Sequence, residues 1–513
     1  MRPEVIRRIR TELGARARLE RAAASRYLAA SAAEEVLAGY PSPAALQQAF
    51  RADRRATVDE VLPRLQRHLR AQLGSDLEAL RQGGLLKESS GPAPFGDPVY
   101  LERVAQLALE EILVNPAAPP LLVAPDPEPA AAEVLAGPVA AAVVFDHPLA
   151  ITHELYPLCT DAYVAAQEDP ATRGGAVVGV HNDWLDPAGR ALRAIAYRAD
   201  LDAFVEAPLP APATLAPVLL LCQSAASHLE VARVLERAGV PHTNRAAPAA
   251  LADDKWGCYR CWSRAGVATP PTLLLERTLA ADRCRQRAQV FMVRCGASRP
   301  GGWVVQPRHG TEGAQVTWVS PGSRAPAQVV SCWESVSSAD DAILRPRVGG
   351  VCLPGEQGPL PFDLRLQVFC DGRDHAAESG YLQVAPGLDS PICSVGRGGR
   401  ILPFSRLADC ELVSVGRDTR PVRWGPHHLA AARDLAARAA RALGPLGLAG
   451  VDVKLDVEGD SLSPTVLDLN PRPAGLLHAD LLDSGEPGLG AGLWRLLAAG
   501  LSHRGAAAIF ASV

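Results

Sequence analysis

The sequence predicts an α/β protein in which a mostly parallel sheet follows a helical N-terminal extension. Three observations lead to this fold class: helical spacing of apolar residues up to about residue 115, a proline-rich break at 116–129, and short apolar runs that alternate with helical stretches from about 120 to 250. Strand, helix and strand in alternation imply a parallel sheet. A chain of 513 residues exceeds the usual ~100–200 residues per domain, so we expect more than one compact unit.

Each expected element has its own signal. The stretches 58–73 and 100–113 repeat apolar residues at helical spacing. The runs AAAVVFDH, GAVVGVHN and APVLLLCQ are predicted strands, and 227–239 is a predicted helix that closes on a glycine. Beyond residue 255 we expect a helix, strands in TPPTLLL and 303–319, and later paired strands that end in VLDLNPRPAG.

Composition and charge exclude several classes of protein. Hydrophobic residues make up 48% and charged residues 21%, which is the balance of a folded globular chain rather than a disordered one. With 52 basic and 56 acidic residues, no overall positive field collects nucleic acid or an anionic membrane. No apolar run approaches the ~20 residues that cross a bilayer. The 11 cysteines show no paired framework and the first residues are charged, so we expect a cytoplasmic protein.

The strongest chemical signal lies in GLAGVDVKLDVEGDSLSPTVLDLNPRP, residues 447–473. Apolar and charged residues alternate in VDVKLD, which predicts a strand with one buried and one polar face. A hairpin centred near residue 460 brings Asp452 opposite Asp468, with Asn470 on the same face. Two carboxylates and an amide oxygen make an oxygen-only site for a hard cation such as Mg²⁺. An ordinary hairpin with a solvated polar face is the alternative that spacing alone leaves open.

This segment resembles the metal-binding end of the ATP-grasp ligases, in which an Asp on one strand is followed by an acidic residue, one residue and then Asn on the next. The helix and glycine turn at 427–447 resemble those of the glutathione-synthetase and ribosomal-protein glutamate-ligase branch, close to the D-alanine:D-alanine ligases. The resemblance covers roughly residues 217–490. It implies an α/β (α+β) ATP-grasp fold with a parallel-sheet pre-ATP-grasp domain and an N-terminal helical extension.

The resemblance also implies a domain order. We expect a helical extension at 1–115, the pre-ATP-grasp domain at 116–253, the small central subdomain at 254–345, the C-terminal subdomain with the metal site at 346–490, and a helix or tail at 491–513.

Lys255 is one of only three lysines in the chain, with Lys87 and Lys454. It stands where the family has an acidic residue followed by a lysine that reaches the nucleotide phosphates. A solvated lysine at a helix end is the alternative. Cys258 and Cys261 form a lone CxxC and are expected to be core thiols rather than zinc ligands.

The segment WVVQPRHGTEGAQV resembles the flap that closes over the triphosphate. Gly310 and Gly313 would let backbone N–H groups approach phosphate oxygens, although a plain hairpin turn is the alternative. Many members carry a lysine before the proline, where this chain has the neutral Gln306. Arg308, two residues further, points the same way if the strand continues, and would then replace the missing charge.

Three arginines and one further carboxylate complete the implied site. FDLRLQVFCDG resembles the Asp-x-Arg strand of the branch, so Asp363 is expected to accept hydrogen bonds from the ribose. Arg365, Arg397 and Arg472 are expected to hold the substrate carboxylate and the acyl phosphate made from it. For Arg365 a surface role on a half-buried strand is the alternative. Lys454 is expected to neutralise Asp452.

The resemblance implies an ATP-dependent ligase that joins a carboxylate to an amine through an acyl phosphate and releases ADP and phosphate. Its cofactors would be ATP and Mg²⁺, with two ions expected and Mn²⁺ as an alternative. The partners would be a small carboxylate and an amine, either amino acid or peptide, without nucleic acid or membrane; a homodimer is one option. The alternative is a catalytically impaired member that serves as a nucleotide-binding, regulatory or interaction module.

Overall fold

The structure is a computed structural model, and it divides into two compact units with the division after Thr243. Apart from ten scattered positions between 39 and 64, it describes residues 139–146, 176–198, 203–215, 217–222, 224–296, 301–310, 315–355, 358–370, 374–388, 392–393, 399–415, 420–458 and 461–473. The expected helices at 58–73 and 100–113 and the expected tail at 491–513 therefore lie almost wholly outside the described residues.

The first unit holds a six-stranded sheet in the order β4-β3-β2-β1-β5-β6. Strands β1 (Val139–Phe145), β2 (Ala176–His181), β5 (Val218–Leu220) and β6 (His242–Thr243) pair in parallel. Strands β3 (Arg190–Arg198) and β4 (Ala203–Thr214) extend the sheet in antiparallel fashion, and the short helix η3 (Asn182–Trp184) follows β2. The expected mostly parallel sheet is confirmed, with an antiparallel edge that the sequence pattern did not indicate.

Helix α8 (Ala225–Arg237) carries the chain from β5 to β6 in this first unit. The Ser224 hydroxyl caps its start by accepting a hydrogen bond from the amide of Ser227. Gly239 adopts a φ of +67° just after the helix, a conformation that glycine reaches without steric cost. The helix therefore ends on the glycine, as predicted.

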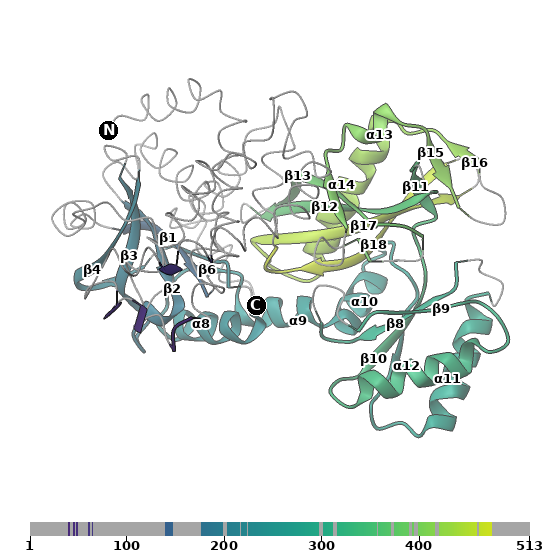
Figure 1. The fold of residues 1–513 in the computed structure, drawn as a ribbon, viewed down its shortest axis with the longest axis horizontal. Helices are drawn as coiled ribbons and strands as arrows, with labels where there is room; N and C mark the ends of the chain where they lie inside the picture. Colours follow the sequence, from purple (N-terminus) through teal and green to yellow (C-terminus); the bar gives the residue numbers. More distant parts are fainter. Residues whose placement is uncertain are drawn as a thin grey trace. The chain divides into compact units, whose positions relative to one another are not determined.

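The second unit begins with α9 (Ala246–Asp253) and α10 (Lys255–Arg264), followed by a four-stranded antiparallel sheet in the order β7-β10-β8-β9. Its strands are β7 (Leu273–Leu275), β8 (Trp303–Pro307), β9 (Thr317–Val319) and β10 (Ala342–Pro346). Helices α11 (Ala281–Arg294) and α12 (Ala325–Ser337) share one apolar core with β8 and β10, and Figure 1 shows them together on one side of this sheet.

The larger sheet of the second unit has eight strands. Six of them follow the order β14-β13-β12-β11-β15-β16. Strand β17 pairs with β12 further along the edge that β11 uses, away from β13, and β18 pairs with β17. The strands are β11 (Val351–Leu353), β12 (Leu360–Cys370), β13 (His375–Val384), β14 (Arg400–Leu402), β15 (Leu412–Ser414), β16 (Arg420–Val422), β17 (Leu448–Glu458) and β18 (Ser461–Asn470). The short helix α13 (Arg406–Asp409) lies between β14 and β15 in the chain.

Helix α14 (Pro426–Arg441) covers one face of this sheet. Its buried residues pack against the apolar residues of two strands. These are Phe362, Leu364, Leu366 and Val368 on β12, and Val451, Val453 and Leu455 on β17. The chain turns at Gly444, whose φ is +103°. Because residues alternate across a strand, the polar residues of β12 and β17 lie together on the opposite face.

The fold is therefore mixed α/β with a parallel-rich sheet and two antiparallel sheets, which confirms the predicted fold class. Among the residues described, no helix combines the length and apolar character needed to span a membrane. Cys258 is buried in the core of the second unit and both cysteines of the CxxC are free thiols, in agreement with the expected core role.

Candidate active site

The first residues of α10 bring Lys255 into the interior of the second unit. The carboxylate of Asp254 starts the helix, because its Oδ1 accepts hydrogen bonds from the amides of Trp256 at 3.1 Å and Gly257 at 3.0 Å. The Lys255 residue is only 8% exposed. Its Nζ donates to the carbonyl of Gly310 and lies 3.6 Å from Oδ2 of Asp468. The alternative of a solvated helix-end lysine is therefore wrong.

Three of the residues predicted from sequence thus meet at one point. Lys255 comes from the start of α10, Gly310 from the segment after β8, and Asp468 from β18. Strands β8 and β9 form an antiparallel pair, with Trp303 opposite Val319, as the flap resemblance implied. Gly313 lies outside the described residues.

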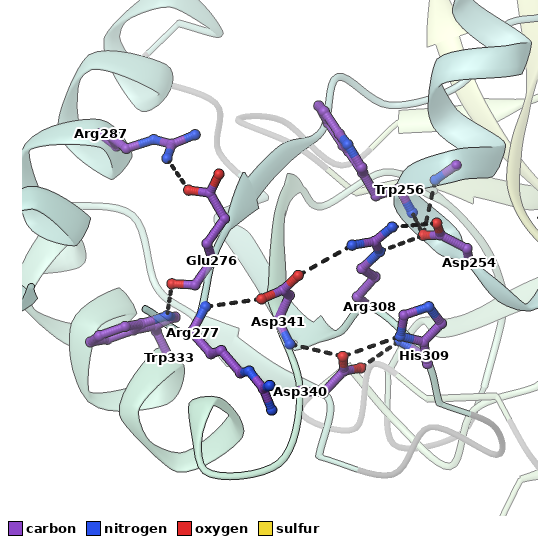
Figure 2. A network of polar contacts seen from close by, with 11 residues as sticks. Asp254, Trp256, Glu276, Arg277, Arg287, Arg308, His309, Trp333, Asp340 and Asp341 are labelled. Atoms are coloured by element: carbon purple, nitrogen blue, oxygen red, sulfur yellow. Dashed lines mark hydrogen bonds and ion pairs between the residues drawn. The ribbon is translucent and has the colours of Figure 1, made fainter. Parts of the chain in front are cut away.

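Arg308 does not continue the strand, because β8 ends at Pro307. Its guanidinium donates to both carboxylate oxygens of Asp254, at 2.8 and 2.6 Å, and to Asp341 at 3.2 Å. Figure 2 shows it held between these two carboxylates. Next to it, the amide of His309 donates to Asp340 at 2.7 Å. The base of the flap segment is therefore fastened to the start of α10 and to the turn before β10.

This network shifts the pKa values of Asp254 and Arg308. Burial opposes ionisation of Asp254, but the hydrogen bonds from Arg308 and Gly257 prevail and lower the pKa of Asp254 below its ordinary value. The hydrogen bond to Asp254 also raises the pKa of Arg308. Two carboxylates thus balance the charge of Arg308. The expectation that Arg308 replaces the charge missing at Gln306 depended on a continuing strand, and that condition fails.

Gln306 lies on β8 opposite Ile343 of β10 and is half-buried. It is on the sheet face away from α11 and α12, since Trp303, Val305, Ala342 and Leu344 belong to the core under those helices. The sequence therefore supplies a neutral side chain at this point of that face.

Two ion pairs cross from β12 to β17 on the polar face of the larger sheet. Arg365 is opposite Asp452 in the register, and its Nε and Nη2 donate to the two carboxylate oxygens at 2.5 and 3.0 Å. Two residues further along each strand, Lys454 Nζ lies 2.6 Å from Oδ1 of Asp363. Both pairs are largely buried, with side-chain exposures of 12% and 17% for the first and 7% and 10% for the second.

These contacts correct one expectation and qualify three. Lys454 neutralises Asp363 and not Asp452, because the antiparallel register puts it opposite Asp363. Asp363 is already ion-paired with Lys454, Arg365 already binds a carboxylate, and both oxygens of Asp452 are engaged. The cross-strand pairs therefore hold these side chains in fixed orientations on the polar face.

Asp452 carries a shifted pKa for a clear reason. Burial raises the pKa of Asp452 to about 6; Arg365 limits the rise, and the nearby carboxylates of Asp363 and Asp468 add to it. Ionisation of Asp452 is thus unfavourable, and an additional cation beside Asp452 and Asp468 would make it less so.

The predicted hairpin is confirmed by the register of β17 and β18. Asp452 is opposite Asp468, and Gly450 is opposite Asn470. The pairing then passes to Val453 opposite Val466, so Leu467 is an extra residue that forms a bulge. The bulge is necessary: it lets Val466 face the core while Asp468 and Asn470 share the polar face.

Arg472 turns away from the position expected of it. Its guanidinium forms a two-pronged ion pair with Asp253, at 2.9 and 2.5 Å, and the residue is only 2% exposed. Its amide donates to Oδ1 of Asn470 at 3.2 Å. Arg472 therefore joins the end of β18 to the end of α9. Arg397 lies outside the described residues.

The donor set fits magnesium better than a transition metal. Within the described ranges, no three His, Cys, Asp or Glu side chains gather as a metal-binding group. Asp468 and Asn470 offer a carboxylate and an amide oxygen on one face, beside Asp452. Mg²⁺ commonly takes one or two carboxylates and completes its shell with water and substrate phosphates. These residues thus fit a nucleotide-bound Mg²⁺ and do not form a closed protein cage.

Sequence reasoning missed three residues that fix this geometry: Asp253, Asn244 and Arg345. Asn244 is 1% exposed and binds the chain at the start of β17 and after β18 through four hydrogen bonds. Arg345 is 2% exposed within β10. A signal existed only for Arg345, since a charge between AIL and Pro in an expected strand is unusual.

No family model matches this sequence, and no curated protein matches it. Solved structures, in contrast, do match it. This chain is similar to ATP-grasp ligases. The D-alanyl-alanine synthetase A of Vibrio cholerae O1 biovar eltor str. N16961 aligns over 71% of this chain and 98% of its own, with 12% identity and a TM-score of 0.42.

Two further solved structures show the same range of similarity. The VanG D-Ala:D-Ser ligase of Enterococcus faecalis aligns over 70% of this chain and 99% of its own, with 14% identity and a TM-score of 0.41. The RimK domain ATP-grasp protein of Sphaerobacter thermophilus DSM 20745 aligns over 70% and 100%, with 17% identity and a TM-score of 0.39.

Proposed function

We propose that this protein is an ATP- and Mg²⁺-dependent ligase that joins a carboxylate to an amine through an acyl phosphate and releases ADP and phosphate. The observation that carries the proposal is the meeting of Lys255, Gly310 and Asp468. A cation, a glycine carbonyl from the flap segment and a carboxylate of the polar strand face converge from three distant parts of the sequence.

The chemistry requires charge compensation. Joining a carboxylate to an amine in water is uphill, so the carboxylate must first receive a good leaving group. Transfer of a phosphoryl group does this, and it needs cations around the phosphates and exclusion of water. Mg²⁺, when bound, would neutralise phosphate charge.

Each residue has a role in this proposal. Lys255, at the base of the flap segment, binds phosphate oxygens, while Gly310 and Gly313 let the backbone approach them. Asp452, Asp468 and Asn470 hold the metal. Arg365, already oriented by Asp452, faces the reacting carboxylate. Arg397 and Asp363 keep the roles that the resemblance gives them, toward the acyl phosphate and the ribose. Arg472 acts through the end of β18, because its guanidinium is bound to Asp253.

The substrates we propose are a small carboxylic acid and an amine of the amino-acid or peptide class. Both would be held by local contacts, because the net charge of −4 creates no field that would gather an anionic polymer. We further propose that the protein is cytoplasmic and that its metal site binds two Mg²⁺ ions.

A second candidate function is a nucleotide-binding module without turnover. Gln306 favours it, since this position is neutral and the charge of Arg308 is balanced by Asp254 and Asp341. Such a protein would bind Mg²⁺–ATP and release no phosphate.

The test is ATP-dependent phosphate release in the presence of Mg²⁺, with pooled amino acids and with or without hydroxylamine. Hydroxamate formation establishes acyl-phosphate chemistry and allows the pool to be divided until the carboxylate is found. Binding of ATP without phosphate release supports the second function. Absence of both binding and release contradicts both functions.

Lys255→Met is the decisive variant, and Arg260→Met is its matched control, because Arg260 is an exposed cation on the same helix. Removing Lys255 is expected to abolish phosphate release and weaken ATP binding, whereas Arg260→Met is expected to behave as wild type. Equal activity of the two variants would remove Lys255 from the site.

A further inference from the structure

Arg345 is a buried cation that the proposed chemistry leaves unused. It lies on β10 opposite Val304, next to Leu344, which packs in the core under α11 and α12. Arg345 thus points to the other face of the strand, and it is 2% exposed. Its Nη1 donates to the carbonyl of Leu467 at 2.8 Å and its Nη2 to the carbonyl of Lys255 at 3.4 Å.

The position of Arg345 is costly. Both of its hydrogen bonds go to main-chain carbonyls, and its Nε has no hydrogen-bond partner among the residues that the structure describes. Burial lowers the pKa of Arg345, with a partial opposing effect from Asp468. Replacement of a buried charge by an apolar residue of similar volume is often neutral or stabilising. Fold stability alone therefore does not explain an arginine here.

The two carbonyls explain what the arginine does. Leu467 is the extra residue of the β18 bulge, so it has no partner residue on β17. Leu467 directly precedes Asp468, and Lys255 is the residue whose Nζ lies 3.6 Å from the carboxylate of Asp468. One guanidinium thus binds the main chain at both ends of the Lys255–Asp468 contact.

The bulge matters for the polar face of the hairpin. Without the extra residue, the alternation of β18 would shift by one position, and a strand that slips by one residue turns every side chain to the other face. Asp468 and Asn470 would then not stand beside Asp452 while Val466 fills the core. A donor fixed on the Leu467 carbonyl holds the bulge in this one arrangement.

We propose that Arg345 is a positioning residue that fixes the β18 bulge and the start of α10, and so sets the affinity of the site for the Mg²⁺–nucleotide complex. This inference rests on the proposed function for its ligand, whereas the bracing of the bulge does not depend on it.

The test compares wild type with Arg345→Met and Arg345→Lys. Arg347→Met is the matched control, because Arg347 lies two residues further along the chain and stacks on Trp318 with its guanidinium carbon 4.2 Å from the ring centre. Calorimetry measures binding of a non-hydrolysable ATP analogue with and without Mg²⁺. Hydrogen exchange measures opening of the amides at 467–470, and thermal unfolding reports global stability.

For Arg345→Met we expect Mg²⁺-dependent binding of the analogue to weaken by about tenfold or more, as for other residues that orient metal ligands. Metal-free binding is expected to change less, the unfolding temperature to stay equal or rise, and exchange at 467–470 to accelerate. Arg345→Lys keeps the charge but cannot reach both carbonyls, so an intermediate loss is expected. Arg347→Met is expected to match wild type.

Unchanged Mg²⁺ dependence together with unchanged exchange in Arg345→Met overturns the inference. A fall in unfolding temperature with equal weakening of metal-dependent and metal-free binding also overturns it, because that is the result of a merely structural role. If wild type itself binds no Mg²⁺–nucleotide, the proposed function fails, and hydrogen exchange alone then decides whether Arg345 holds the bulge.

Discussion

Asn244→Ala is expected to destabilise the second unit by about 4 kcal/mol, because Asn244 makes four buried hydrogen bonds worth about 1 kcal/mol each. Its Nδ2 donates to the carbonyls of Leu448 and Pro471, both at 2.6 Å. Its Oδ1 accepts from the amides of Gly447 at 2.8 Å and Leu448 at 3.3 Å. Alanine leaves these groups buried without the side chain that pairs them.

The variant Asn244→Asp separates hydrogen bonding from packing. A carboxylate retains the acceptors but has no N–H to offer to the carbonyls of Leu448 and Pro471, so its cost is expected to equal or exceed that of alanine. The assay is urea denaturation followed by far-ultraviolet circular dichroism, with the free energy of unfolding obtained by linear extrapolation.

Asn182→Ala serves as the control, since the buried Oδ1 of Asn182 has no hydrogen-bond partner among the described residues. A change of less than about 1 kcal/mol is expected for this control. The reasoning is refuted if Asn244→Ala also costs less than about 1 kcal/mol, because the four contacts would then contribute nothing net.

Three further predictions concern the polar face and the segment before β11. Since the pKa of Asp452 is raised from 3.8 to about 6, the folded state keeps a proton that the unfolded chain releases; this contribution is complete below pH 3.8 and is lost as pH rises through 6. Wild type should therefore lose up to about 3 kcal/mol of stability across this window and Asp452→Asn should not, and parallel pH profiles of the two in urea denaturation would contradict this. Gln367→Leu should stabilise by about 1–3 kcal/mol, because the amide of Gln367 is fully buried and neither its oxygen nor its nitrogen has a partner in the described part of the chain; a lower unfolding temperature would count against it. Gly349→Ala should cost at least about 1–2 kcal/mol, since Gly349 has a φ of +88° and a Cβ would stand 2.5 Å from Cδ of Lys454; unchanged stability would show that the segment relaxes freely.

The local sequence was sufficient to predict elements whose signals are local. Alternation in VDVKLD predicted the strand and its polar face, and the hairpin centre near 460 placed Asp452 opposite Asp468, as the register confirms. The glycines after α8 and α14 marked helix ends through backbone rules that involve only neighbouring residues.

Prediction failed where the partner of a charge is distant in the chain. Arg308 would replace the charge missing at Gln306 only if β8 continued, yet Asp254 and Asp341 bind it and the strand ends before it. Lys454 was assigned to a carboxylate two residues away, yet the neighbouring strand supplies Asp363. A sequence shows how many charges a segment holds, but the register of a strand from elsewhere in the chain decides which of them meet.

The sequence by itself therefore determined the class of fold, the strand and helix periodicities, and the set of acidic, basic and glycine residues at the candidate site. The tertiary structure decided which of them are paired. It brought Lys255, Gly310 and Asp468 to one point and tied Arg472 to Asp253. The physical reason is that helix caps and strand alternation depend on a few adjacent residues. The ion pairs, and the hydrogen bonds of Arg345 to the carbonyls of Leu467 and Lys255, form only after distant segments have packed.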